Sequence, residues 1–243
     1  MIGDTHSDGT VTWKEDFLMG ISKLPLVVGY NHKETYQTSG SFTAPITGLY
    51  RITLQGAGGG GAGAGTANDS SSYHNSGGGG AGGGGQIVYA ELTAGTSYSF
   101  TIGAGGTGGA AGSSSISNNG GNGTSGGDTA ITIGADTYTA IGGDGGNNSI
   151  TAGRGGAGGF YKINDTLYTD KWRGASGQAG SLGSSHVPYA SGGRGCFGGG
   201  NGGSGGEINW QGTYKAGGVG GDGYIKFEWF DPADAFPSLY PSE

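Results

Sequence analysis

The sequence predicts an all-β fold with an irregular glycine-rich region, in which an antiparallel β-sandwich base carries a bundle of polyglycine-II helices with recognition loops. Three observations predict it. Glycine makes up 63 of the 243 residues and recurs at every third position in several runs. Short segments with the apolar–polar alternation of strands separate these runs. Tight turns join the segments in pairs, always on the same side of the glycine runs.

The glycine runs keep a strict spacing of three residues. They comprise Gly77, Gly80 and Gly83; Gly120, Gly123 and Gly126; Gly153, Gly156 and Gly159; Gly174, Gly177, Gly180 and Gly183; Gly199, Gly202 and Gly205; and Gly217, Gly220 and Gly223. This spacing fits neither an α-helix nor a β-strand. It fits an extended left-handed helix with about three residues per turn, whose backbone groups point sideways. Such helices must pair with neighbouring chains, and glycine allows the close approach that this requires.

Disorder and a collagen-like triple helix are the alternative interpretations of this composition. Collagen needs an unbroken Gly-X-Y repeat and abundant proline, whereas this chain has 6 prolines and only short runs. Disorder is typical of glycine-rich chains with few aromatic residues. Here well-patterned strands bound the runs, and Tyr, Trp and Asn occupy the segments between them. The packed bundle is therefore the favoured interpretation.

The expected strands alternate in direction. They cover residues 49–54, 86–92, 97–102, 129–133, 137–141 and 224–230. Thr93-Ala94-Gly95 is expected to be a tight connection that reverses the chain, and the short turn Gly134-Ala135 suits a hairpin. If the first strand runs toward the glycine-rich cap, every glycine excursion leaves from one edge of the base and every tight turn lies at the other. The cap then consists mainly of residues 56–85, 103–128 and 142–223.

The last excursion predicts one further chain reversal. Five glycine runs between residues 142 and 223 would leave the final strand pointing the wrong way. One run must therefore be split or lie outside the bundle. The stretch 192–206, which Cys196 and Phe197 interrupt, is the predicted place. We expect the segment 160–173, with Phe160 and Trp172, to lie on the basal side and to cover the flank of the bundle.

The composition excludes several classes of protein. The net charge is −7 with 11 Lys and Arg residues, so no basic surface for nucleic acid is expected. One cysteine, Cys196, rules out an internal disulfide framework. No run of 18 apolar residues predicts a membrane span, and the N-terminus lacks the pattern of a secretory signal. The apolar share of 33% confines any hydrophobic core to a few strands.

No motif predicts an enzyme, a cofactor or a metal site. Residues 103–108 satisfy G-x-G-x-x-G, but no helix pattern follows and the match is expected by chance in this composition. The histidines are scattered without ligand spacing and are expected to be solvated loop residues: His6, His32, His74 and His186. No nucleophile elbow or carboxylate pair can be argued.

The chain reversals are the candidate receptor-binding loops. Tyr and Trp with Asn supply large and adaptable contact surfaces, and aromatic faces suit sugar rings or apolar protein patches. The candidate contact residues are Tyr73, His74, Asn75, Asn118, Asn119, Asn147, Asn148, His186, Tyr189 and Trp210. Each of the aromatic residues could instead cover the flank of a bundle that has few side chains of its own.

The segment 42–61, Phe-Thr-Ala-Pro-Ile-Thr-Gly-Leu-Tyr followed by Gly-Ala-Gly-Gly-Gly-Gly after the strand, resembles the opening of the glycine-rich domain in bacteriophage tail-fibre proteins. Residues 99–106 and 220–229 are similar to later parts of the same pattern. The glycine cap also resembles the distal tail-fibre adhesin of T-even-like phages. The resemblance implies a virion protein at the distal end of a tail fibre, whose loops bind a bacterial surface glycan or outer-membrane protein.

The resemblance also implies a division of the chain. Residues 1–40 would join the protein to an upstream tail-fibre protein or shaft, residues 41–230 would form the base and cap, and residues 231–243 would be a C-terminal tail. A homotrimer is expected if the first segment is shaft, and a monomer if the protein is a separate tip. A structural or ice-binding polyglycine-II protein and an exported bacterial adhesin remain the alternatives.

Overall fold

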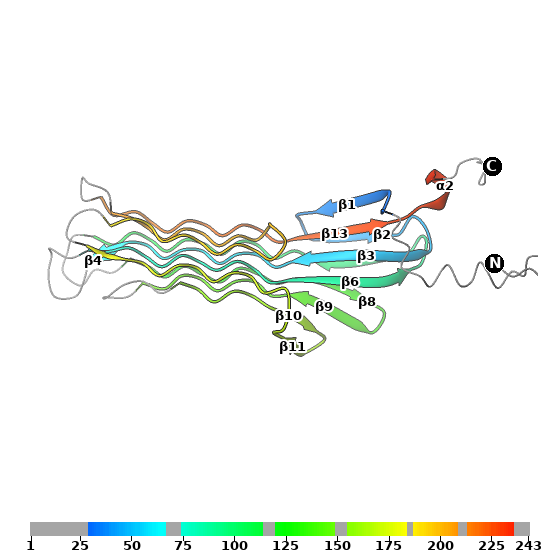
Figure 1. Cartoon of the computed structure of the whole chain (residues 1–243), viewed down its shortest axis with the longest axis horizontal. Helices are drawn as coiled ribbons and strands as arrows, with labels where there is room; N and C mark the ends of the chain where they lie inside the picture. The colour runs from blue at the N-terminus through cyan, green and yellow to red at the C-terminus, as the bar shows by residue number, and fades with distance from the viewer. Residues whose placement is uncertain are drawn as a thin grey trace, which may run out of the picture.

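The protein is elongated, with β-sheets at one end and glycine-rich segments that run side by side to the other (Figure 1). The computed structural model describes residues 29–66, 74–113, 120–148, 155–183, 187–208 and 213–235. Its regular structure is nearly all antiparallel β, as the sequence predicts. We call the part formed by the two larger sheets the base, and the opposite end of the glycine-rich segments the distal end.

One layer of the base is a four-stranded antiparallel sheet. Its order is β1 (His32–Tyr36), β13 (Tyr224–Trp229), β3 (Gly48–Gln55) and β6 (Gly85–Leu92). In β3, Tyr50, Ile52 and Leu54 are fully buried, while Leu49 and Arg51 lie on the outer face. This alternation is the pattern that predicts a half-buried strand.

The second layer is a six-stranded antiparallel sheet. Its order is β11 (Thr166–Tyr168), β10 (Tyr161–Ile163), β9 (Asp136–Ala140), β8 (Thr129–Ile133), β7 (Ser97–Thr101) and β2 (Gly40–Thr43). The loops β6–β7 and β8–β9 are tight, and Gly95 and Gly134 adopt φ values of 72° and 63°. These values lie in the left-handed region, which glycine adopts without the cost that a Cβ imposes.

The two sheets face each other across one hydrophobic core. Phe42 from the six-stranded sheet stacks on Phe227 from the other sheet, with ring centroids 4.1 Å apart. Phe100 and Ile131 add to the same cluster, whose remaining large members are Tyr50, Ile52, Leu54, Val88, Leu92, Ile225, Phe227 and Trp229. The apolar residues of the chain are thus concentrated in the base, as their low share requires.

The six expected strands are all present, and no strand end differs from its expected position by more than one residue. The sequence analysis did not identify β1, β2 and the β10–β11 hairpin as strands. β1 has the sequence HKETY and lies at a sheet edge with three exposed residues, so it lacks the alternation that marks the other strands. Because β1 pairs with β13, the base begins at His32, inside the segment 1–40 that was expected to be a separate lead-in.

The glycine segments lie outside the strands and bond to one another through the backbone. In the described part of the chain they cover residues 56–64, 76–84, 103–112, 120–128, 141–148, 155–159, 174–181, 190–195, 199–206 and 216–223. Segment 56–64 shows the periodicity. The N–H groups of Gly58, Gly59 and Gly60 donate to carbonyls of three different segments, at Gly221 (2.8 Å), Ala81 (2.9 Å) and Thr124 (2.9 Å). The next three residues donate to the same three segments, at Gly218, Gly78 and Gly121.

The carbonyls of segment 56–64 serve three further segments. Those of Gly58, Gly59 and Gly60 accept from Gly106, Gly203 and Gly146. Segment 76–84 has the same environment: it donates to three segments and accepts from three others. These two segments therefore form a central pair, and every backbone group along them is directed at a neighbour.

The outer segments surround the central pair in chain order. Consecutive hydrogen bonds join 103–112 to 120–128, and so on through 141–148, 155–159, 174–181, 190–195, 199–206 and 216–223. The ring then closes, since Gly217 donates to Gly109 at 2.9 Å. From 103–112 to 216–223, each segment of the ring is connected to the next by a reversal of the chain.

Close packing explains why the segments are made of glycine. A Cβ placed on Gly59 would lie 2.1 Å from the carbonyl oxygen of Asp144, and one on Gly61 would lie 1.9 Å from that of Ser204. The obstructing atoms belong to rigid backbone that cannot move aside. Side chains occur mainly at outward positions of the ring, such as Thr107, Asn201 and Val219.

The predicted split within 192–206 is present. A turn at Cys196 and Phe197 ends segment 190–195, and segment 199–206 runs back toward the distal end. Gly198 and Gly200 have φ values of 87° and 57°, which a non-glycine residue rarely adopts. Residues 142–223 therefore hold an even number of segments, and the last strand returns to the base in the antiparallel direction.

Gln55 connects the base to the bundle. It is fully buried at the end of β3, and its side-chain nitrogen lies within 3.0 Å of the carbonyl oxygens of Gly56, Gly83 and Gly84. Its side-chain oxygen accepts a hydrogen bond from Phe197. The side chain thus bonds to the start of the first glycine segment, the end of the second and the turn between two outer segments.

Candidate functional site

The distal end is held by a small sheet of its own. Strands β12 (Leu182–Gly183), β5 (His74–Asn75) and β4 (Gly65–Thr66) pair antiparallel in that order. Isolated bridges connect Ile208 to Val187 and to Tyr214. These pairings fix the points from which the distal reversals leave the bundle.

A hydrophobic cluster lies beneath these reversals. Ala64, Val187 and Ile208 are fully buried there, and the half-buried Tyr214 packs against them. Val187 donates to the carbonyl of Ile208 at 3.1 Å, and Ala64 donates to that of Lys215 at 3.0 Å. Apolar side chains are scarce in the glycine segments, so this cluster gives the distal end a small core of its own.

Several parts of the chain meet around Ala64. Its carbonyl accepts from Gly112, and the side chain of Asn148 donates to the neighbouring carbonyl of Gly63. Ser76 donates to the carbonyl of Ser181 at 3.0 Å. The described residues on either side of gaps 67–73, 114–119, 149–154, 184–186 and 209–212 therefore lie together at the distal end (Figure 1). The segments that were expected to form the tip therefore leave and re-enter the described part of the chain at this end.

The structure describes some of the predicted contact residues at this end. Tyr189 is 58% exposed and follows the buried Val187 by two positions. Asn147 is exposed. Asn148 is half-buried, and its backbone N–H donates to the side-chain oxygen of Asn122 at 2.7 Å.

Asn75, one of the predicted contact residues, lies in the interior of the distal end. It is fully buried, because β5 is paired on both sides by Gly65 and Leu182. Its side chain offers no surface for contact. The backbone of His74 belongs to the same strand. The other predicted contact residues lie outside the described residues: Tyr73, Asn118, Asn119, His186 and Trp210.

The segment 160–173 lies on the basal side, as predicted. Its hairpin, β10–β11, extends the six-stranded sheet of the base. Tyr161 stacks on Tyr168 at 5.2 Å, and Trp172 contacts both Tyr161 and Phe197. The guanidinium of Arg173 lies 4.8 Å from the centre of the Phe160 ring. These aromatic residues cover the junction of base and bundle.

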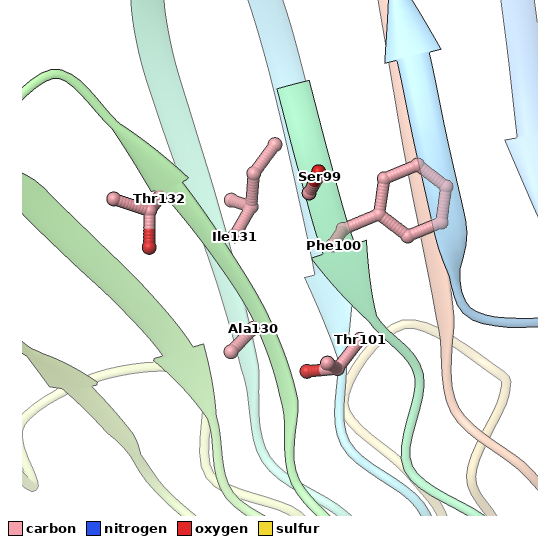
Figure 2. Close-up of a pocket in the computed structure, with 6 residues that line it drawn as sticks. All are labelled: Ser99, Phe100, Thr101, Ala130, Ile131 and Thr132. Carbon is pink, nitrogen blue, oxygen red and sulfur yellow. The ribbon is translucent and has the colours of Figure 1, made fainter. Parts of the chain in front are cut away.

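A depression of about 270 Å³ lies where β7 and β8 diverge on the six-stranded sheet. Figure 2 shows its lining residues, Ser99 to Thr101 from β7 and Ala130 to Thr132 from β8, with the ring of Phe100 turned away from Thr132. The two strands pair only through Phe100–Ile131 and Thr101–Ala130. No ionisable side chain lines the depression, so it offers no group for acid–base chemistry.

The shifted pKa values have structural causes. Burial raises the pKa of the Cys196 thiol, which favours the unreactive protonated form. Burial and a hydrogen bond to Glu34 raise the pKa of Tyr36 to about 12. Burial also raises the pKa of Tyr50, whose hydroxyl donates to the carbonyl of Ile46 at 2.9 Å.

One cluster of metal-ligating side chains was missed by the sequence analysis. His32, Asp231 and Asp234 each place a donor atom within 4.8 Å of the others. The expectation that His32 is a solvated loop residue is wrong, because it lies in β1 and stacks on Trp229. His32 is some 200 positions from the two aspartates in sequence, so spacing gives no signal that they meet.

Comparison with known protein families and with curated proteins finds no match. Within the described ranges, no helix has the length and apolar character needed to cross a membrane. A functional assignment must therefore rest on the geometry of the chain itself. That geometry is a long body with reversals gathered at one end.

Proposed function

We propose that this protein is the receptor-binding tip of a phage tail fibre, in which a polyglycine-II bundle presents loops to a bacterial surface receptor. The receptor is a cell-surface polysaccharide or an outer-membrane protein. The observation that carries the proposal is that the described residues on either side of five gaps in the chain lie together at the end opposite the base. No covalent chemistry is part of it.

The hydrogen-bond pattern supports the assignment of polyglycine-II. Successive N–H groups of segment 56–64 address three neighbours in turn, and the set repeats after three residues. A helix with about three residues per turn produces this rotation. Since the bonds lie between segments, the bundle is cross-linked along its length and can hold loops in fixed relative positions.

The polarity of the molecule supports a tip. The hydrophobic core, β1 and residues 231–235 all belong to the base, whereas the described residues of the distal end form the smaller Ala64–Val187–Ile208 cluster. A base of this kind suits attachment to an upstream fibre protein. Loops on a rigid scaffold suit binding, because their sequences can vary without loss of the fold.

The exposed flank of the bundle argues against the ice-binding alternative. Ice binding would favour one small residue repeated at the outward positions. The outward residues instead differ between segments: Thr107 and Ala110, Asn201 and Ser204, Val219 and Asp222. Several of them bond to backbone, as when Asp222 accepts from Gly105 at 2.7 Å.

A competition assay tests the proposal. Purified protein should bind cells of the phage host and reduce adsorption of the phage in proportion to its concentration. Tyr189→Ala should weaken binding, because this exposed side chain lies at the distal end. Val219→Ala is the matched control, since Val219 is 68% exposed but lies on the flank. Trp210→Ala and a Tyr73→Ala/His74→Ala pair extend the test to the other reversals.

Two results would contradict the proposal. One is equal binding by all distal variants together with a loss caused by Val219→Ala, which would move the contact to the flank. The other is the absence of binding to any bacterial surface combined with thermal hysteresis in ice-growth assays. That result would favour the structural or ice-binding alternative.

A further inference from the structure

We propose that His32, Asp231 and Asp234 bind a zinc ion that fastens the first strand of the base to the C-terminal segment. The donor atoms of the three side chains all lie within 4.8 Å of one another. They lie at the end of the base remote from the glycine segments, where β1 begins and the short helix α2 (Pro232–Ala235) follows β13 (Figure 1). The proposal is independent of receptor binding.

The packing of β1 against β13 orients the imidazole. The antiparallel register places His32 opposite Trp229, and the two rings stack with centroids 5.2 Å apart and an interplanar angle of 11°. This contact fixes the plane of the imidazole. The edge of the ring that carries Nε2 faces the carboxylate of Asp234 at 2.7 Å.

Asn31 holds the other side of the site. Its side-chain nitrogen donates to the carbonyl of Asp231 at 2.8 Å, and its side-chain oxygen accepts from the N–H of Asp231 at 2.7 Å. Asp231 also accepts from Ala233 through one carboxylate oxygen at 2.9 Å. The backbone that bears both carboxylates is thus tied to the residue before His32.

The environment of His32 Nε2 indicates a missing partner. The atom is enclosed, yet it forms no hydrogen bond of regular geometry despite its short distance to Asp234. An ordinary ion pair would align the N–H with the carboxylate. Nitrogen and oxygen ligands of a tetrahedral zinc lie about 3.3 Å apart, so binding requires the exposed Asp234 side chain to move back by about half an ångström from its 2.7 Å contact. Bound ions are one of the known reasons for a buried polar atom without a partner.

The donor set selects the ion. Imidazole and carboxylate together suit zinc, whose bonds to nitrogen and oxygen are about 2.0–2.2 Å. Calcium and magnesium prefer shells made entirely of oxygen. Three protein donors leave one tetrahedral position for water.

The test is a titration of metal-stripped, untagged full-length protein with zinc chloride, followed by calorimetry. We expect one saturable site. His32→Gln and Asp234→Asn should each weaken it by about tenfold or more. Asp165→Asn, which removes an exposed carboxylate from the β10–β11 turn, should leave the affinity unchanged. Zinc should also raise the Tm of the wild type and of Asp165→Asn, with little effect on the two site variants.

Three results would overturn the proposal: no saturable zinc binding by the wild type, affinity that survives both site variants, or an equal shift in Tm for all proteins. Survival in the variants would assign the zinc to other histidines. The Asp234→Asn variant keeps the test informative if His32→Gln fails to fold, because the Asp234 side chain is 63% exposed and makes no core contact. Magnesium chloride, as a second probe, should produce no shift in Tm.

Discussion

The side-chain oxygen of Gln55 accepts a hydrogen bond of 2.7 Å from the backbone N–H of Phe197, 142 residues further along the chain. The same side chain donates to carbonyls of the two central glycine segments. One amide therefore joins the end of a core strand, the central pair and the turn that divides two outer segments.

Replacement of Gln55 by leucine should destabilise the protein. The N–H of Phe197 and the carbonyl of Gly56 would lose the partner that Gln55 provides, at about 1–3 kcal/mol for each buried group left unpaired, whereas the carbonyls of Gly83 and Gly84 keep backbone bonds from Cys196 and Gly56. We expect the midpoint of urea unfolding to fall clearly. Gln37→Leu, at an exposed position, is the control and should change the midpoint little. Equal midpoints for both variants would show that the junction does not depend on Gln55.

Alanine in place of Gly59 should disrupt the bundle. Its Cβ would lie 2.1 Å from the carbonyl oxygen of Asp144, and rigid backbone surrounds it. Overpacking of this kind costs about 3 kcal/mol or more where the surroundings cannot shift. Gly48→Ala is the control, because no atom lies within 4 Å of its added Cβ. Thermal unfolding followed by circular dichroism compares the two variants, and a similar Tm would contradict the packing described above.

Amide exchange should differ between the central pair and the ring. The N–H groups of segments 56–64 and 76–84 are buried and bonded, so they exchange only when the bundle opens. Exposed residues of outer segments, such as Thr107 and Ala175, should exchange sooner. Mass spectrometry of peptides from each segment measures the order. Rapid exchange throughout residues 56–84 would show that these stretches are mobile coil and would remove the platform for the loops.

The stability of the base should fall at high pH partly through Tyr36. Burial and the hydrogen bond to Glu34 raise its pKa to about 12 in the folded protein, against about 10 for an unfolded tyrosine. Between these values the folded state keeps a proton that the unfolded state releases, so the free energy of unfolding falls as the pH rises. This contribution is fully present below about pH 10 and is lost as the pH approaches about 12.

The Tyr36→Phe variant isolates this effect. Phenylalanine cannot ionise, so the variant should show a shallower loss of stability between about pH 10 and pH 12 than the wild type. Urea unfolding at several pH values measures the difference. Parallel curves for the two proteins would exclude Tyr36 as a source of the alkaline loss.

The sequence predicts the architecture of the base where each strand carries its own signal. The alternation in residues 49–54 and 224–230 reflects one buried and one outward face, and the tight turn at Gly134 joins the paired strands β8 and β9. β1 could not be predicted in this way, because an edge strand with three exposed residues has no apolar face. The last strand can return to the base only if an even number of glycine segments precedes it. This requirement was enough to predict the turn at Cys196 and Phe197.

The arrangement of the glycine segments could not be predicted from residue types. Their bonds join backbone to backbone, so no side chain specifies which segments become neighbours. The residue type of Gly58 does not select Gly221 over any other glycine as its partner, and the same holds for Gly61. The candidate site residues also differ in whether the sequence could predict their positions. Tyr189 could be expected at the distal end from its place in a reversal, whereas the burial of Asn75 follows from the pairing of β5 on both sides. The His32 cluster depends on β1 lying beside β13.

The order of the ring has a consequence for biosynthesis. Gly58 and Gly61 bond to Gly221 and Gly218, which leave the ribosome 163 and 157 residues later. The interior of the bundle is thus completed only when its final strand arrives, and contacts this distant in sequence form slowly. A stop codon shortly after residue 208 would leave the earliest glycine segment open to water along one side. Truncated products should therefore be degraded or aggregate, with little accumulation of a shorter soluble protein.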